Sequence, residues 1–113
     1  MISEFLPEAE QELREAARYY ESEAPGLGVT YIAEVRRVVR SIIENPYTAA
    51  AVGSGIRRKV LSNFPYNILY SVERDVIVIV AVAHQKRRPR YWRARIKQIK
   101  ERKSSPIKEG NEE

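Results

Sequence analysis

Two stretches in the first half of the chain place apolar residues three and four positions apart, which is the spacing of an amphipathic helix. The first begins at Pro7, a residue that the first turn of a helix tolerates, and reaches about Ala24. Residues 25–28 (PGLG) interrupt it, and the second stretch then continues to the NP pair at residues 45–46. The face of this second helix that we expect to be buried comprises Val29, Ile32, Val35, Val39, Ile42 and Ile43. The pattern predicts a helical hairpin.

Strand patterns fill most of the second half. Residues 56–61, 66–73 and 76–84 are separated by short turn segments, so we expect a three-stranded antiparallel meander. The last of the three (VIVIVAVAH) is an almost wholly apolar run and is predicted to be a central strand. Residues 2–5 are a candidate edge strand, whereas the small residues and two glycines of the 46–55 connection predict a mobile loop.

A short C-terminal helix is predicted over residues 91–103, with Trp92, Ile96 and Ile99 directed towards the core. Segment 104–113 has little to bury, and we expect it to be disordered. The chain is long enough for one modest core. The predicted fold class is therefore α+β, with a single domain over residues 1–103 in which an N-terminal helical hairpin packs on a small antiparallel sheet.

Composition excludes several kinds of site. The chain has no cysteine and one histidine, which excludes a disulfide framework, a thiolate metal site and a His-pair zinc site, so we expect neither a metal nor another cofactor. No apolar run approaches the ~20 residues that a membrane-spanning helix needs, and the N-terminus lacks the pattern of a signal peptide. We expect a cytoplasmic protein without a membrane partner.

Charge is distributed unevenly along the chain. Residues 1–55 carry 5 Lys/Arg against 9 Asp/Glu, whereas residues 56–103 carry 14 against 3. Because this change coincides with the change from helical to strand patterns, it predicts one basic face on a single domain and a negatively charged partner. The alternative is a solvated basic face without a function.

The basic residues are densest directly after the predicted central strand. Residues 86–95 contain six cations, two aromatic residues and no carboxylate, a combination that suits a polyanion because cations neutralise phosphates and flat rings stack on bases. The candidate nucleic-acid or target-binding residues of this segment and of strand 56–61 are Arg57, Lys59, Lys86, Arg88, Arg90 and Arg93. Since successive strand residues alternate between faces, Arg58 must face away from Arg57 and Lys59.

Several segments follow one another in a specific order between about residues 2 and 96. They are the helix EAEQELREAARYYE, the GLG break, a second helix that ends in ENP, then IRR, FPYNILY, the apolar strand and HQKRRPRYW. Together they resemble the RelE/ParE superfamily of toxins. The resemblance implies the toxin of a type II toxin-antitoxin system, a helical hairpin against an antiparallel sheet, and a cognate antitoxin that wraps its C-terminal segment around the toxin in a hetero-oligomer.

The resemblance covers two branches with different targets. The RelE branch cleaves messenger RNA in the ribosomal A site, whereas the ParE branch poisons DNA gyrase and is not known as a nuclease. RNA cleavage through the 2′-hydroxyl needs a group to take the proton, cations to stabilise the phosphorane and a donor for the leaving oxygen. If the protein is an RNase, the candidate catalytic residues are Arg58, His84, Arg87 and Tyr91.

The sequence departs from the RelE pattern at three positions. Asn67 stands where an arginine commonly opens the strand, Val60 stands near the position of an expected lysine, and Tyr91 lies two residues earlier than the family tyrosine. Residues 84–87 (HQKR) also resemble the strand end of ParE-type toxins. These departures favour DNA gyrase as the target, with a ribosome-dependent mRNA endoribonuclease as the alternative.

The candidates also have plainer interpretations. His84 at a strand end can simply bind the backbone, and Trp92 can be a core residue instead of a stacking platform. A second function class is a non-toxic basic binding module, which would hold nucleic acid or an acidic protein without chemistry or an effect on growth.

Overall fold

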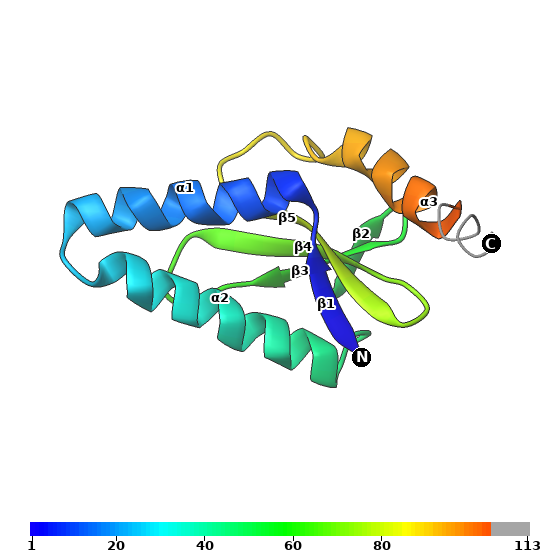
Figure 1. The fold of residues 1–113 in the computed structure, drawn as a ribbon, viewed down its shortest axis with the longest axis horizontal. Coiled ribbons are helices and arrows are strands. Elements are labelled where there is room, and N and C mark those ends of the chain that lie inside the picture. The colour runs from blue at the N-terminus through cyan, green and yellow to red at the C-terminus, as the bar shows by residue number, and fades with distance from the viewer. Residues whose placement is uncertain (105–113) are drawn as a thin grey trace, which may run out of the picture.

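A helical hairpin packed on a five-stranded sheet makes up the fold (Figure 1). The computed structural model describes residues 1–104, so the tail predicted over 104–113 lies outside the described residues except for Ser104. The helices are α1 (Pro7–Glu23), α2 (Leu27–Glu44) and α3 (Ile96–Ser104), and the 3₁₀ turn Arg93–Arg95 precedes α3. The strands are β1 (Ile2–Phe5), β2 (Ala50–Gly53), β3 (Ile56–Val60), β4 (Tyr66–Val72) and β5 (Val76–His84).

The turn of the hairpin is tighter than the sequence suggested. The Glu21 carboxylate accepts the backbone N–H of Gly26 at 2.9 Å and that of Gly28 at 3.0 Å, so α2 begins at Leu27 with two of its first donors satisfied. A Cβ added at Gly28 would lie 2.5 Å from the carbonyl oxygen of Ala17. The close approach of the two helices therefore depends on glycine at this position.

The predicted apolar face of α2 is wrong at Val29, which is 71% exposed. The buried positions instead follow the 3-4-3-4 spacing from Gly28 through Tyr31, Val35, Val38 and Ile42. The hairpin prediction itself is confirmed. Val29 lies one residue after Gly28 and two before Tyr31, and neither spacing places it on the buried stripe.

The sheet has the strand order β1-β5-β4-β3-β2. Strands β3, β4 and β5 form the predicted antiparallel meander, and β1 lies at an edge as predicted. The predicted α+β fold class is confirmed, but the sheet is mixed and not wholly antiparallel, because β1 pairs with β5 in parallel, from Ile2 opposite Val76 to Phe5 opposite Ile79. The hairpin and strands β2 to β4 together form the long connection between these two parallel strands. The 46–55 connection, predicted to be a mobile loop, contains β2, which pairs antiparallel with β3.

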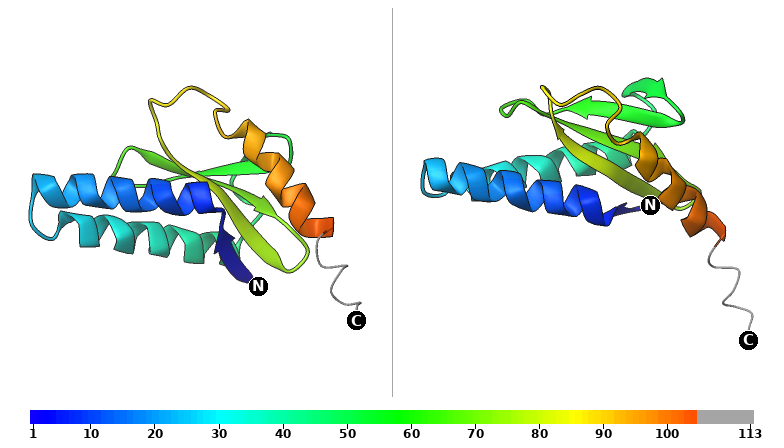
Figure 2. Two further views of the ribbon diagram at one scale, coloured as in Figure 1. Left: turned by 45° about the horizontal axis from the view of Figure 1, so that its top comes forward. Right: turned by 90° about the horizontal axis from the view of Figure 1, so that it is seen from above.

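Two elements cover the sheet from different sides. The hairpin lies along one face, and the Tyr70 hydroxyl on β4 donates to the carbonyl of Pro46 at the end of α2 at 2.7 Å. Helix α3 lies at the end of the sheet remote from the α1–α2 turn (Figure 2). Trp92 and Ile99 are buried as predicted and Ile96 is partly buried, although the regular helix begins only after the 3₁₀ turn. Within residues 1–104, no helix is both long and apolar enough to cross a membrane.

Candidate functional site: a basic pocket on the open face of the sheet

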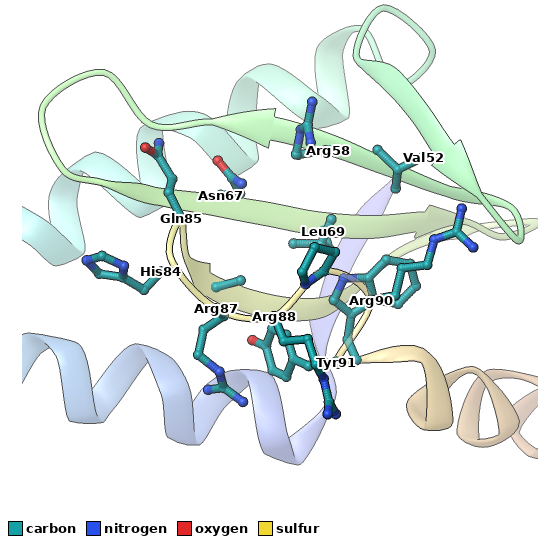
Figure 3. Close-up of a pocket in the computed structure, with 13 residues that line it drawn as sticks. Val52, Arg58, Asn67, Leu69, His84, Gln85, Arg87, Arg88, Arg90 and Tyr91 are labelled. Carbon is teal, nitrogen blue, oxygen red and sulfur yellow. The ribbon is translucent and has the colours of Figure 1, made fainter.

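A pocket of about 260 Å³ opens between strands β3 and β4 and the loop after β5 (Figure 3). We call residues 85–92 the basic loop and this cavity the basic pocket. Among the described residues that line it, four are arginines and none is Asp or Glu. Its charged and polar lining residues, apart from the aromatic Tyr91 and Trp92, are Arg58, Asn67, His84, Gln85, Arg87, Arg88 and Arg90. An anionic group is therefore the ligand that this lining favours.

Strand alternation decides which residue of the basic trio on β3 reaches the pocket. Arg57 is paired with Tyr70, which faces the hairpin, whereas Arg58 is paired with Leu69 on the opposite face. Lys59 shares the hairpin side with Arg57. Arg58 therefore lines the basic pocket, and its two neighbours do not.

Arg57 instead holds the segment that leads into β2. Its Nη1 donates to the carbonyl oxygens of Ala49 at 2.7 Å and of Tyr47 at 3.2 Å. The guanidinium also lies 5.3 Å from the centroid of the Tyr47 ring. These contacts order part of the 46–55 connection, which the sequence predicted to be mobile. The Arg57 side chain therefore has a structural role.

His84 is the last residue of β5, between the basic pocket and a smaller groove beside α1. Its Nδ1 accepts the backbone N–H of Lys86 at 3.0 Å, which fixes the start of the basic loop. The imidazole lies edge-on to Tyr66, with the ring centroids 5.1 Å apart. His84 thus binds the backbone, as in its structural interpretation, and also borders the pocket.

Tyr91 connects the basic loop to α1. Its hydroxyl donates to Glu12 Oε2 at 2.7 Å, and the Arg87 guanidinium carbon lies 3.8 Å from the centroid of its ring. Arg95 binds the same carboxylate through two hydrogen bonds, at 2.8 and 3.0 Å. Burial, followed by the hydrogen bond to Glu12, raises the pKa of Tyr91 far above its usual value. The raised pKa disfavours the tyrosinate still further, and the phenol donates its proton in the hydrogen bond to Glu12.

Arg90 closes the opposite side of the pocket. Its φ of 63° is in the left-handed region, which is costly for a residue other than glycine. This conformation brings its guanidinium over β2, where a Cβ added at Gly53 would lie 3.3 Å from Nη2. Deeper in the pocket, Asn67 Oδ1 is buried and has no hydrogen-bond partner among the described residues. The pocket thus combines cations at its rim with an acceptor at its base.

A second surface runs along the hairpin. A groove of about 390 Å³ lies between α1, α2 and β1, with the apolar side chains of Phe5, Leu13, Val35, Val39 and Ile43 in its lining. We call it the hairpin groove. Arg36, Arg40 and Glu10 stand at its margin. Its chemistry suits an amphipathic segment of another chain.

Comparison with known families gives a match over residues 4–89 to the ParE toxin of the type II toxin-antitoxin system parDE. The chain belongs to the ParE toxin family. A solved structure of the chromosomal ParDE TA system from P. aeruginosa has a similar fold, with a TM-score of 0.65 at 15% identity, over 74% of this chain and 92% of that chain. The comparison with curated protein sequences gave no match. The superfamily predicted from the order of the segments is confirmed.

For this ParE-family chain, the structure gathers part of the predicted site. All four candidate catalytic residues, Arg58, His84, Arg87 and Tyr91, line the basic pocket, together with Arg88 and Arg90. Arg57, Lys59, Lys86 and Arg93 are not among its lining residues. Within residues 1–104, no group of three or more His, Cys, Asp or Glu side chains is placed to hold a metal ion.

Glu12 and Arg95 were not among the predicted site residues, although Glu12 binds both Tyr91 of the basic loop and Arg95. Glu12 lies three residues after Ala9 and four before Ala16, both of which are buried, so it occupies a position on the apolar stripe of α1. A carboxylate on a buried stripe needs a cation or a hydrogen-bond donor as a partner, so the position of Glu12 in the sequence could have indicated a buried polar contact. The identity of that partner, 83 residues away along the chain, was not readable from spacing.

Proposed function

We propose that this ParE-family toxin arrests growth by inhibiting DNA gyrase, and that a cognate antitoxin neutralises it. The observation that carries the proposal is the state of Tyr91, whose hydroxyl is bound to Glu12 and whose pKa is raised by burial. A nuclease of the RelE type would need an acid-base group free to exchange a proton with the RNA. Asn67 in the same pocket supplies no cation where that branch has an arginine.

In this proposal the basic pocket is a recognition surface without chemistry of its own. Arg58, Arg88 and Arg90 are exposed and line a pocket whose described lining contains no carboxylate. Such a surface binds acidic protein groups or the phosphates of DNA held by gyrase, through charge-assisted hydrogen bonds. Inhibition would then follow from trapping the enzyme, and the toxin would need no cofactor.

The hairpin groove is the surface that we assign to the antitoxin. Its floor is apolar, and the exposed Arg36 and Arg40 at its margin would meet acidic residues of an amphipathic segment. Because this groove does not share lining residues with the basic pocket, the antitoxin segment can occupy it independently of the target. A longer antitoxin segment would reach both surfaces.

A ribosome-dependent mRNA endoribonuclease is the second candidate, and one observation favours it. Arg58, His84 and Arg87 line one pocket, so two cations and a titratable imidazole stand together where a phosphate would bind. In that case His84 would have to exchange the proton, since Tyr91 is committed to Glu12.

The experiment that separates the two targets uses the purified toxin with two assays in parallel. We expect inhibition of gyrase supercoiling and gyrase-dependent DNA breaks, and in cells a DNA-damage response that co-expressed antitoxin suppresses. Toeprinting of ribosomes in cell-free translation should show no A-site cleavage. Cleavage that disappears in Arg87→Ala would overturn the gyrase proposal. Unimpaired growth at verified soluble expression would instead favour the non-toxic binding module.

A further inference from the structure

We propose that Glu12 is a positioning residue, which holds the ring of Tyr91 and, through that ring, fixes the Arg87 guanidinium between the basic pocket and the smaller groove beside α1, both of which Arg87 lines (Figure 3). Glu12 would thus maintain the arrangement of side chains at the recognition surface. This inference rests on the proposed function only in assigning Arg87 to that surface. Among the described side-chain hydrogen bonds, the bond from Tyr91 to Glu12 is the only one between the basic loop and α1.

The position of Glu12 follows from the way the sheet ends. Strand β1 accompanies β5 only as far as Ile79, so the β5 edge beyond this residue has no neighbouring strand. Glu12 Oε1 accepts the backbone N–H of Val82 at 3.0 Å, and Arg95 Nη1 donates to the carbonyl of Val80 at 3.0 Å. The two side chains thus replace the missing strand at the edge of the sheet.

The Glu12 carboxylate has one bond more than this capping role requires. Its ion pair with Arg95 is largely buried, with both side chains 15% exposed, and it already neutralises the charge. The bond from the Tyr91 hydroxyl to Oε2 is additional, and it fixes the orientation of the ring in the loop. Removing this hydroxyl would leave the ion pair and the capped strand edge in place.

The Tyr91 ring in turn holds Arg87. The guanidinium of Arg87 lies 3.8 Å from the ring centroid, and that of Arg95 lies 5.1 Å from it. Both cations are attracted to a ring that the hydrogen bond to Glu12 keeps in one orientation. The Arg87 backbone has its own turn bond, from its N–H to the carbonyl of His84 at 3.0 Å. The ring contact therefore places the charged end of the side chain, not the main chain.

Two substitutions separate positioning from folding. Tyr91→Phe removes only the hydroxyl, and Glu12→Gln removes the charge while keeping a similar shape. The matched control is Glu8→Gln, one turn earlier on α1, because Glu8 accepts a hydrogen bond from Gln98 of α3 at 2.7 Å and takes part in none of the described side-chain hydrogen bonds of the basic loop. If Glu12→Gln fails to fold, Tyr91→Phe alone still tests the proposal.

The first readout does not involve a target. Trypsin cleavage after Arg87 and Arg90 in the native protein measures the order of the loop, and the NMR signal of the Arg87 Nε–H reports the ring current of Tyr91. We expect faster cleavage and a reduced ring-current shift in Tyr91→Phe and Glu12→Gln, and wild-type values in Glu8→Gln. Unchanged loop cleavage and an unchanged shift in Tyr91→Phe would overturn the proposal.

The second readout is a double-mutant cycle on the concentration needed to inhibit gyrase. Tyr91→Phe should raise it by about two- to five-fold, the range of one exposed cation–π contact, because the ring remains but Glu12 no longer holds it in the orientation that places Arg87. In the Arg87→Ala background the same change should add nothing, whereas a merely structural role would give additive effects. Additivity would overturn the positioning role. If the wild-type toxin does not inhibit gyrase, the proposed function fails, and the proteolysis and NMR results still decide the role of Glu12.

Discussion

The hairpin groove and the basic pocket offer a partner opposite kinds of recognition. The groove presents the partly buried side chains of Phe5, Leu13 and Ile43, whose exposed surface is removed from water only when another chain covers it. The pocket presents arginines that stay hydrated until an anion binds. A bound segment in the groove gains mainly from burial, which is insensitive to salt. A ligand of the pocket gains mainly from charge, which salt screens. Mutations in the hairpin groove should therefore affect neutralisation by the antitoxin, and mutations in the basic pocket should affect binding of the target, each without the other.

The largest effect is expected from a charge placed in the hairpin groove. Leu13→Glu should weaken antitoxin binding by about 100-fold or more, because a carboxylate buried without a partner costs several kcal/mol. Toxicity should persist and become resistant to the antitoxin. Isothermal titration with purified antitoxin measures the change, and Gln11→Glu, an exposed residue of α1 outside the groove, is the control. Normal affinity in Leu13→Glu would place the antitoxin elsewhere.

The next effect concerns the two faces of β3. Arg58→Ala removes a cation from the basic pocket and should weaken gyrase inhibition by about 10- to 100-fold, the value of one charge-assisted hydrogen bond. Lys59→Ala, one residue further on the opposite face, should change inhibition much less. Both variants should bind the antitoxin normally. Equal losses in the two variants would show that the target reads net charge and not the pocket.

These two positions also show how far the sequence could be read. Period-two alternation established that Arg58 and its neighbours face opposite ways, but both faces are polar here, so the choice needed Tyr70 as a reference for the hairpin side. The strands of the meander and the helices were predictable because their apolar spacing is local. Strand β2 was not, since its small residues carry no pattern and its order depends on Arg57.

The residue types of the basic pocket could be predicted from the sequence, but most of the contacts between them could not. The cations of the basic loop follow directly from their density after β5. The partner of Tyr91 could not be predicted, because Glu12 and Tyr91 are 79 residues apart and meet only when α1 packs against β5. The parallel pairing of β1 with β5 has the same cause, since it is set by the path of the chain through the hairpin and strands β2 to β4 and not by the sequence of β1.

A smaller effect is expected at Arg57, which faces the hairpin side and has no place in the pocket. Arg57→Ala should lower the free energy of unfolding by about 1–2 kcal/mol, because the carbonyls of Tyr47 and Ala49 lose their donor. Gyrase inhibition at a temperature well below the melting point should be unchanged. Urea unfolding measures the first quantity and the supercoiling assay the second. A loss of inhibition without a loss of stability would contradict the structural role of Arg57.

The smallest effect concerns Glu34, a buried residue of α2, whose protonation at low pH should lower the stability of the fold. Its carboxylate accepts hydrogen bonds from Arg37 at 2.8 Å and from the Ser62 N–H at 3.1 Å, and the Arg37 bond is the main cause that lowers its pKa.

Because the pKa of Glu34 is lower in the folded state, the unfolded chain binds the proton at a higher pH than the folded chain does. The stabilisation is therefore complete above the unfolded-state pKa and is lost as the pH falls through the folded-state value. Glu34→Gln should remove this part of the acid sensitivity, about 2–4 °C in melting temperature for an ion pair in which Glu34 is buried but the Arg37 side chain is 55% exposed. Since Glu34 lies in neither the groove nor the pocket lining, gyrase inhibition and antitoxin affinity should both stay at wild-type values, and a change in either would show that the hairpin side and the open face are coupled.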